Sequence, residues 1–125
     1  MEQRIIIFKA WRLGGGEWVE GDLLHKGSRV YIYHPFVNDN GLLIENVEVD
    51  PTTVCQFTGL KDKEGKEIFE GDLLAEKSFP MYEVGYINGE FAASYIGENT
   101  FIFKLYALSN DCVVCGSKYD RKGGN

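Results

Sequence analysis

The sequence has little basic charge, and no part of it is strongly basic. Its 125 residues contain 13 Lys and Arg against 19 Asp and Glu, which gives a formal net charge of −6. Division after residue 50 leaves each half at −3, so neither half forms a basic arm. Because duplex-DNA binding depends on phosphate neutralisation by Lys and Arg, the charge argues against a duplex-DNA-binding protein. A small local basic patch stays open.

Long apolar runs and a paired set of cysteines are also missing. The apolar run that starts at Ile5 ends at Phe8, which is too short for a secretion signal or a membrane-spanning helix. The three cysteines are an odd number and do not suggest a disulfide framework. We therefore expect a cytoplasmic protein with reduced thiols and no membrane association.

Motifs that carry catalysis or bind cofactors are lacking as well. His25 and His34 are the two histidines, and neither has a cysteine or a second histidine at ligand spacing. The sequence contains no Gly-x-Ser-x-Gly elbow, no phosphate loop and no Gly-x-Gly-x-x-Gly. We therefore expect no catalytic residues, no metal site and no cofactor.

Two weaker patterns leave a redox site or a cation site as alternatives. Cys112 and Cys115 form a C-x-x-C pair, but a strand points positions i and i+3 to opposite faces, so we predict unbridged, buried, structural thiols. Carboxylates also gather around two Glu-Gly-Asp segments, at residues 20–22 and 70–72. If these segments met in space they could bind a divalent cation, although solvated turn acids are the simpler interpretation.

The residues that are present favour short strands and tight turns. Fifteen glycines and 14% aromatic residues accompany an ordinary 44% of hydrophobic residues, and no ten-residue segment has a helical period. The length suits one domain. We predict a mainly β protein with little helix, apart from a single helical turn after Asp50, which would cap it with Pro51 at its first position. The predicted strands span residues 4–11, 29–33, 42–49, 82–87, 90–95, 101–108 and 112–115. Pro35 is expected to end the strand that begins at residue 29. Asn88-Gly89 is expected to form a type I′ hairpin turn.

The stretch from Gln56 to Leu74, QFTGLKDKEGKEIFEGDLL, organises the chain. A polar run ending in Gly65 predicts a turn, and Gly71-Asp72 predicts a bend that feeds a strand. At least one of Leu73 and Leu74 should then lie in the core. Gly59 and Glu70 complete this structural motif.

This stretch resembles the signature of the YopX family of small phage and prophage proteins. Phe8, Ala10 and Trp11 resemble the family's opening strand, and residues 113–119 its closing strand, with Cys115 in place of an aliphatic residue. The resemblance implies a mainly β fold with a small SH3-like barrel in the C-terminal half. It implies no established activity and no site residues. We expect an N-terminal β region over residues 1–53, the SH3-like barrel over 54–119 and a flexible tail over 120–125, in one integrated unit.

An internal similarity relates the two halves of the sequence. Residues 17–24, EWVEGDLL, match residues 67–74, EIFEGDLL, at six of eight positions. We interpret this as a possible structural repeat of a turn, Glu-Gly-Asp and a strand, and the N-terminal region as a degenerate copy of the central motif.

The expected function is that of a non-catalytic binding or assembly module that acts through protein–protein contacts. Tyr31 and Tyr33 alternate with Val30 and Ile32, so their rings are predicted to face outward and bind a protein partner or a second copy. Tyr82 and Tyr86 share a face with Val84, which leaves their exposure open. A single-stranded nucleic-acid-binding barrel is the alternative, because aromatic rings stack on bases; the missing basic groove disfavours it. An enzyme is the third candidate.

Overall fold

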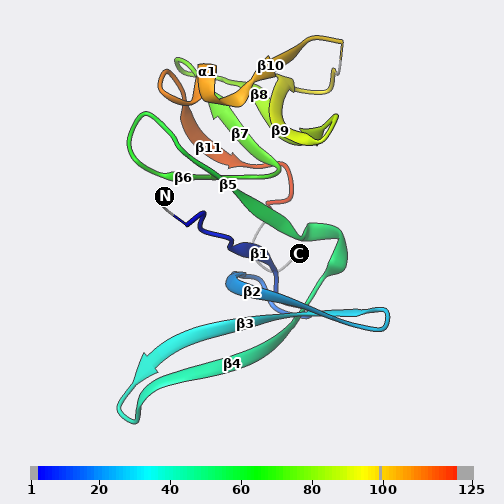
Figure 1. Cartoon of the computed structure of the whole chain (residues 1–125), viewed down its shortest axis with the longest axis vertical. Helices are drawn as coiled ribbons and strands as arrows, with labels where there is room; N and C mark the ends of the chain where they lie inside the picture. The colour runs from blue at the N-terminus through cyan, green and yellow to red at the C-terminus, as the bar shows by residue number, and fades with distance from the viewer. Residues whose placement is uncertain (1–2, 99, 121–125) are drawn as a thin grey trace. The chain divides into compact units, whose positions relative to one another are not determined.

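A computed structural model describes residues 3–98 and 100–120, and over these residues the chain is mainly β (Figure 1). The strands form two antiparallel sheets, with the orders β4-β3-β2-β1-β5-β6 and β10-β9-β8-β7-β11. The chain divides between Gln56 and Phe57 into two compact units. Most of the predicted tail, residues 121–125, lies outside the described residues.

The N-terminal unit is a meander of four strands. They are β1 (Phe8–Trp11), β2 (Trp18–Lys26), β3 (Arg29–Asn38) and β4 (Gly41–Val49). The short 3₁₀ helix η1 (Pro51–Thr53) leads to β5 (Cys55–Lys61), whose first residues pair with β1. The side chain of Asp50 accepts a hydrogen bond from Thr52 N, which confirms the predicted cap.

The predicted first strand, residues 4–11, begins later than expected. β1 starts at Phe8, while Ile5 and Ile6 precede it and are 59% and 49% exposed. The continuous apolar run from Ile5 to Phe8 predicts a strand covered on both faces, and this prediction is wrong for these two residues. A continuous β-branched run indicates a buried strand only where neighbouring strands reach it, and the pairing of β1 with β2 and β5 begins at Phe8.

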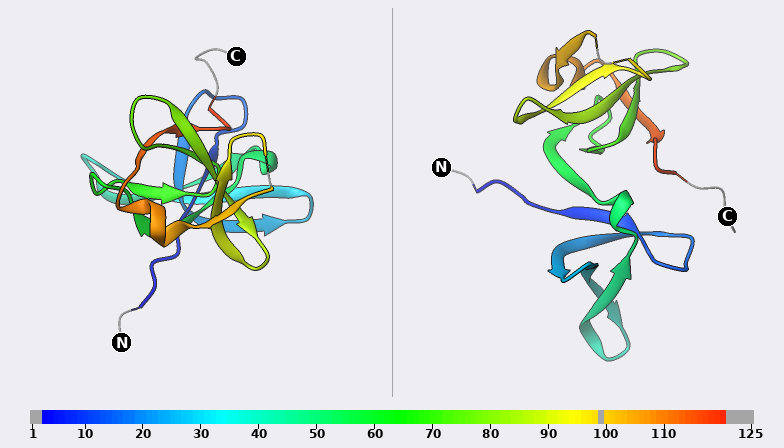
Figure 2. Two further views of the ribbon diagram at one scale, coloured as in Figure 1. Left: turned by 90° about the horizontal axis from the view of Figure 1, so that it is seen from above. Right: turned by 90° about the vertical axis from the view of Figure 1, so that its right-hand side faces the viewer.

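The predicted end of β3 at Pro35 is also wrong. β3 continues to Asn38 and forms a long, twisted two-stranded hairpin with β4 (Figures 1 and 2). Pro35 pairs with Ile44 on β4, whereas the register between β3 and β2 stops at Tyr33. Beyond Tyr33, β3 has no strand of the described residues beside it on the β2 side. A proline, which lacks an N–H group, is therefore tolerated there.

The core of the N-terminal unit lies on one face of this meander. Its members are Ala10, Val19, Val30, Ile32, Val47 and Val49, all buried. The alternation predicted for Val30 with Ile32 and for Val47 with Val49 is confirmed. Phe8, Leu23 and Val54 pack against them.

The C-terminal unit contains the rest of β5 and six further strands. They are β6 (Glu67–Phe69), β7 (Asp72–Ala75), β8 (Pro80–Ile87), β9 (Glu90–Tyr95), β10 (Ile102–Lys104) and β11 (Val113–Ser117). The predicted hairpin is confirmed: Ile87 pairs with Glu90 across Asn88 and Gly89, whose φ angles are 53° and 82°.

The predicted long strand over residues 101–108 is wrong. β10 stops at Lys104, and the one-turn helix α1 (Leu105–Ser109) follows. The turn directs Leu105, 2% exposed, into the core, whereas Phe101 is 59% exposed. The alternating apolar residues therefore form a strand only where they pair with β9, from Ile102 to Lys104. After Lys104 the chain turns into α1, which buries Leu105.

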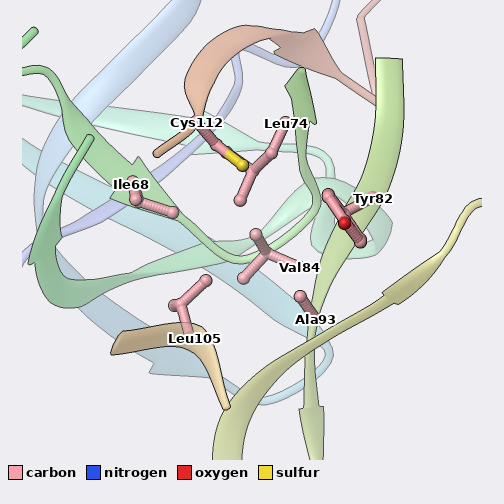
Figure 3. Close-up of a cluster of buried hydrophobic side chains, with 7 residues drawn as sticks. All are labelled: Ile68, Leu74, Tyr82, Val84, Ala93, Leu105 and Cys112. Carbon is pink, nitrogen blue, oxygen red and sulfur yellow. The ribbon is translucent and has the colours of Figure 1, made fainter. Parts of the chain in front are cut away.

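Seven buried side chains form the core of the C-terminal unit (Figure 3). Leu74 and Val84 lie at its centre in the figure, with Ile68, Leu105 and Cys112 directed towards them. Leu74 is fully buried, which confirms the prediction that this strand contributes to the core. Ala93 and Tyr82 complete the set.

The C-terminal unit does not confirm the predicted SH3-like barrel. Over the described residues neither sheet closes on itself, and β10 and β11 are the two edges of the five-stranded sheet. The mainly β class is confirmed, and the closed barrel is not.

Candidate functional site

Tyr31 and Tyr33 lie on β3 with the predicted orientation. Val30 and Ile32, which alternate with the tyrosines, are 5% and 0% exposed, so the tyrosines occupy the opposite face of the strand. Tyr33 is 41% exposed, whereas Tyr31 is half-buried. Of the two, Tyr33 offers the larger surface to another molecule.

The exposed face of Tyr33 continues along the β3–β4 hairpin as an apolar surface. Pro35 and Val37 follow Tyr33 at strand spacing, and Ile44 and Leu42 lie directly opposite them on β4. Val37, Leu42 and Ile44 are 77%, 71% and 69% exposed. We call these five residues the hairpin face. Sequence reasoning missed it because it ended the strand at Pro35.

A pocket of about 510 Å³ lies at the inner end of the hairpin face. Its lining comes from β2, β3 and the segment before β1, and comprises Ile7, Trp18, Glu20, Gly21, Asp22, Tyr33, His34 and Pro35. We call it the β2–β3 pocket. Tyr33 and Pro35 belong to both the pocket and the hairpin face, so one ligand can touch both.

The pocket forms where β2 changes partner. Trp18 to Gly21 pair with β1, and Asp22 to Lys26 pair with β3. At the change, a Cβ on Gly21 would lie 1.9 Å from the carbonyl oxygen of Tyr33. Only glycine therefore allows β2 to approach β3 this closely before the strands diverge.

His34 closes this region by a contact between the same two strands. Its Nδ1 lies 2.8 Å from the carbonyl oxygen of Glu20. A carbonyl oxygen only accepts, so Nδ1 is the protonated nitrogen in this contact. Without a ligand partner in the sequence, His34 is expected to be an ordinary surface residue; it is half-buried and lines the pocket.

The pocket combines aromatic and acidic groups. Trp18, Glu20 and Asp22 occupy alternate positions of β2 and thus one face. The ammonium Nζ of Lys9 lies 4.5 Å from the centre of the Trp18 ring, and Lys9 is the register partner of Glu20. The Trp11 ring packs on Trp18 with 5.1 Å between centroids. These contacts hold the Trp18 ring in place.

The two Glu-Gly-Asp segments have different structures. Gly71 has a φ of 84° and lies in the turn between β6 and β7, whereas Gly21 lies inside β2 and does not have a positive φ. Asp72 is 2% exposed, but Asp22 is exposed. The predicted repeat of a turn, Glu-Gly-Asp and a strand is therefore wrong for the first copy, where glycine serves close strand contact instead.

The central motif has a structural role in the C-terminal unit. Asp72 Oδ2 accepts a hydrogen bond from Phe69 N at 2.7 Å, and Gly71 N donates to Val84 O at 2.8 Å. Gly59 and Gly65 have φ angles of 88° and 85°. Glu70 is half-buried and lines a second hollow.

Asp62, which sequence reasoning placed in a simple polar turn, is a further structural carboxylate. It is 6% exposed, and its Oδ1 accepts hydrogen bonds from Glu64 N and Lys66 N at 2.8 and 2.9 Å. Its Oδ2 accepts one from Val114 N at 2.8 Å. Burial alone would raise the pKa of Asp62, but these three N–H groups outweigh it and lower the pKa below its usual value. The sequence signal for this role of Asp62 was its position three residues before the turn glycine Gly65.

The second hollow, of about 380 Å³, belongs to the C-terminal unit. Two of its charged groups pair with each other: Glu83 Oε2 lies 3.7 Å from Lys118 Nζ, and Glu83 Oε1 also accepts a hydrogen bond from Gly97 N. The hollow therefore offers a charged ligand less than the β2–β3 pocket does.

The tyrosines left open by the sequence divide between core and surface. Tyr82 is 7% exposed, and burial raises its pKa. Tyr86 is 59% exposed and packs edge-on against Phe91. Tyr82 also stacks on Tyr95, which in turn contacts the exposed ring of Phe101.

The cysteines are free thiols. Cys112 is buried, as predicted, and so is Cys55, whereas Cys115 is exposed and the prediction of its burial is wrong. Cys115 lies on β11, an edge strand, and its thiol donates to Leu73 O. Burial raises the pKa of Cys112, which keeps it protonated and unreactive. Within the described residues no three His, Cys, Asp or Glu side chains form a group that could hold a metal ion.

No helix in the described part of the chain is long and apolar enough to cross a membrane. No curated protein matches the chain. Among solved structures, the chain is similar to protein EF1440 from Enterococcus faecalis, with 26% identity and a TM-score of 0.58 over 92% of this chain and 94% of that one.

The family comparison covers nearly the whole chain. The family model described as "YopX protein" matches residues 7–122, which include the central motif, the hairpin face and the β2–β3 pocket. The chain belongs to the YopX family.

Proposed function

We propose that this chain is a non-catalytic binding module of phage or prophage origin, which binds a protein partner through the hairpin face. The observation that carries the proposal is the set of exposed apolar side chains on one side of β3 and β4, from Tyr33 to Ile44. Contiguous exposed apolar surface of this kind is typical of protein-interaction sites.

Charge favours a different protein over a second copy. The chain carries a net charge of −6, and Glu20 and Asp22 adjoin the hairpin face. Two copies would bring like charges together, whereas a basic partner would be attracted. Cytoplasmic action of the protein is part of this proposal.

The test compares three proteins as baits for affinity capture, followed by measurement with the purified partner. Val37→Ser with Ile44→Ser removes apolar area from the hairpin face. Leu13→Ser with Ile96→Ser removes exposed apolar side chains elsewhere and is the matched control. We expect one protein to be retained by the wild type and the control, and its affinity to fall about tenfold or more in the hairpin-face variant. Equal affinity in all three proteins would contradict the proposal.

A second variant tests the tyrosines themselves. Tyr31→Ser with Tyr33→Ser should leave the circular dichroism spectrum unchanged and lower the affinity for the same partner. Unfolding would show that the rings belong to the core. A lower mass in light scattering would assign the face to a second copy of the chain. Salt-dependent loss of single-stranded DNA binding would favour the nucleic-acid alternative.

A further inference from the structure

We propose that the β2–β3 pocket binds one basic side chain, the guanidinium of an arginine or the ammonium of a lysine, presented by an apolar segment of the partner protein. This inference rests on the proposed function, since it names the chemistry that the partner brings to the same site.

The aromatic groups of the pocket suit a cation. Trp18 and Tyr33 come from two strands and line the same space. The faces of tryptophan and tyrosine rings attract cations, and tryptophan does so most strongly. The Trp18 ring already has the ammonium of Lys9 at 4.5 Å, so the structure itself contains a cation at this ring.

The carboxylates give the pocket a negative charge. Glu20 and Asp22 are exposed and lie two residues apart on the same face of β2 as Trp18. Carboxylates that accept hydrogen bonds from a guanidinium form stronger contacts than neutral groups do. An anion would be repelled by both carboxylates, and a neutral ligand would gain no charge-assisted contact from them.

The surroundings of the pocket distinguish a side chain of a protein from a free cation. Tyr33 and Pro35 connect the pocket to the hairpin face, which is apolar as far as Val37 and Leu42. A basic residue in the pocket thus places its neighbouring residues on that face. The long apolar stem of arginine or lysine can itself pack along Pro35 and Ile7.

The experiment titrates the whole chain with N-acetyl-arginine methylamide and with the citrulline analogue, which has the same shape but no charge. The indole N–H of Trp18 and the amide of Gly21 report binding in ¹H–¹⁵N spectra. We expect saturable shifts with the arginine probe, and affinity about tenfold weaker for the citrulline probe. The lysine probe should shift the same resonances.

Variants of the chain test which groups bind the probe. Glu20→Gln with Asp22→Asn should weaken the arginine probe about tenfold. Asp39→Asn with Glu64→Gln removes the same charge from exposed turn positions and should leave affinity within about twofold. Lys9→Gln should tighten binding, because it removes a competing ammonium. All three variants should keep the wild-type melting temperature, since the changed side chains are exposed or half-buried.

The outcomes separate this inference from the proposed function. Equal affinity for the arginine and citrulline probes, or no saturable shift at Trp18 and Gly21, overturns the basic-side-chain inference. If that occurs while the hairpin-face variant still loses its partner, the proposed function stands alone. If the arginine probe binds as expected but the hairpin-face variant retains its partner, the pocket is a cation site and the proposed function is wrong.

Discussion

Asp62 has a role at the scale of a single residue that its place in a polar loop conceals. One oxygen orders the turn through Glu64 N and Lys66 N, and the other accepts a hydrogen bond from Val114 N in β11. The residue thus joins segments 52 positions apart in the sequence. A buried carboxylate is retained here because three backbone donors replace its water.

Asp62→Asn is the first prediction of stability. An amide has one acceptor oxygen, so at least one of the three N–H groups would face an NH₂ donor. We expect a loss of about 2 to 4 kcal/mol in the free energy of unfolding at pH 7. Glu64→Gln, an exposed change in the same turn, is the control and should cost less than about 0.5 kcal/mol. Denaturant titration followed by circular dichroism measures both; equal stability of the two variants would contradict the role assigned to Asp62.

The same residue gives a pH dependence whose direction follows from its pKa. The pKa of Asp62 is lower in the folded chain than its usual value. Its contribution is therefore complete above the unfolded-state pKa, near 4, and is lost as the pH falls through the folded-state pKa. The wild type should lose more stability than Asp62→Asn between about pH 5 and pH 2.

At the scale of elements, β2 is the strand on which the N-terminal unit depends, because it serves two partners in turn. Its first half pairs with β1 and its second half with β3. The change takes place at Gly21, where the Tyr33 carbonyl occupies the space of a side chain. The β2–β3 pocket is a consequence of this change.

Gly21→Ala should therefore be far more damaging than its size suggests. The added methyl group meets backbone, which cannot rotate away, so we expect a loss of about 3 kcal/mol or more. Gly16→Ala is the matched control, because a Cβ there has no neighbour within 4 Å and no positive φ is required. It should change stability by less than about 0.5 kcal/mol. Similar melting temperatures for the two variants would refute the close approach of β2 to β3.

Local chemistry explains which elements could be predicted from the sequence. Asn88-Gly89 and the Asp50-Pro51 cap depend on φ preferences and short-range hydrogen bonds, and both were predicted correctly. The continuation of β3 through Pro35 and the helix at Leu105 depend on which strand lies alongside. That information is not local, so periodicity alone could not supply it.

The candidate site was predictable only in part, for the same reason. Alternation around Ile32 placed Tyr33 on the outer face. The other pocket groups, Trp18, Glu20 and Asp22, come from a segment whose sequence resembles a turn motif. Their arrangement follows from the partner change of β2, which requires the tertiary contact at Gly21.

At the scale of the whole molecule, β5 is the strand that crosses the boundary between the two units. Its first residues pair with β1, at Phe8↔Gln56 and Lys9↔Cys55. Its later residues pair with β6, at Phe57↔Phe69 and Lys61↔Glu67. Unfolding of either unit would remove the pairing from one end of this strand. We therefore expect the chain to unfold as one cooperative unit.

The chain contains separate reporters for the two units. Both tryptophans, Trp11 and Trp18, lie in the N-terminal unit, so their fluorescence follows its unfolding. Cys112 is fully buried in the core of the C-terminal unit, so pulsed thiol labelling of its peptide follows the other. In a denaturant titration the two midpoints should coincide. Ile32→Val, which should remove about 1 kcal/mol from the N-terminal core, should lower both midpoints equally. If the Cys112 midpoint stayed in place while the fluorescence midpoint fell, the two units would be independently folding domains, because unfolding of β1 and β3 would leave β7 and its neighbours folded.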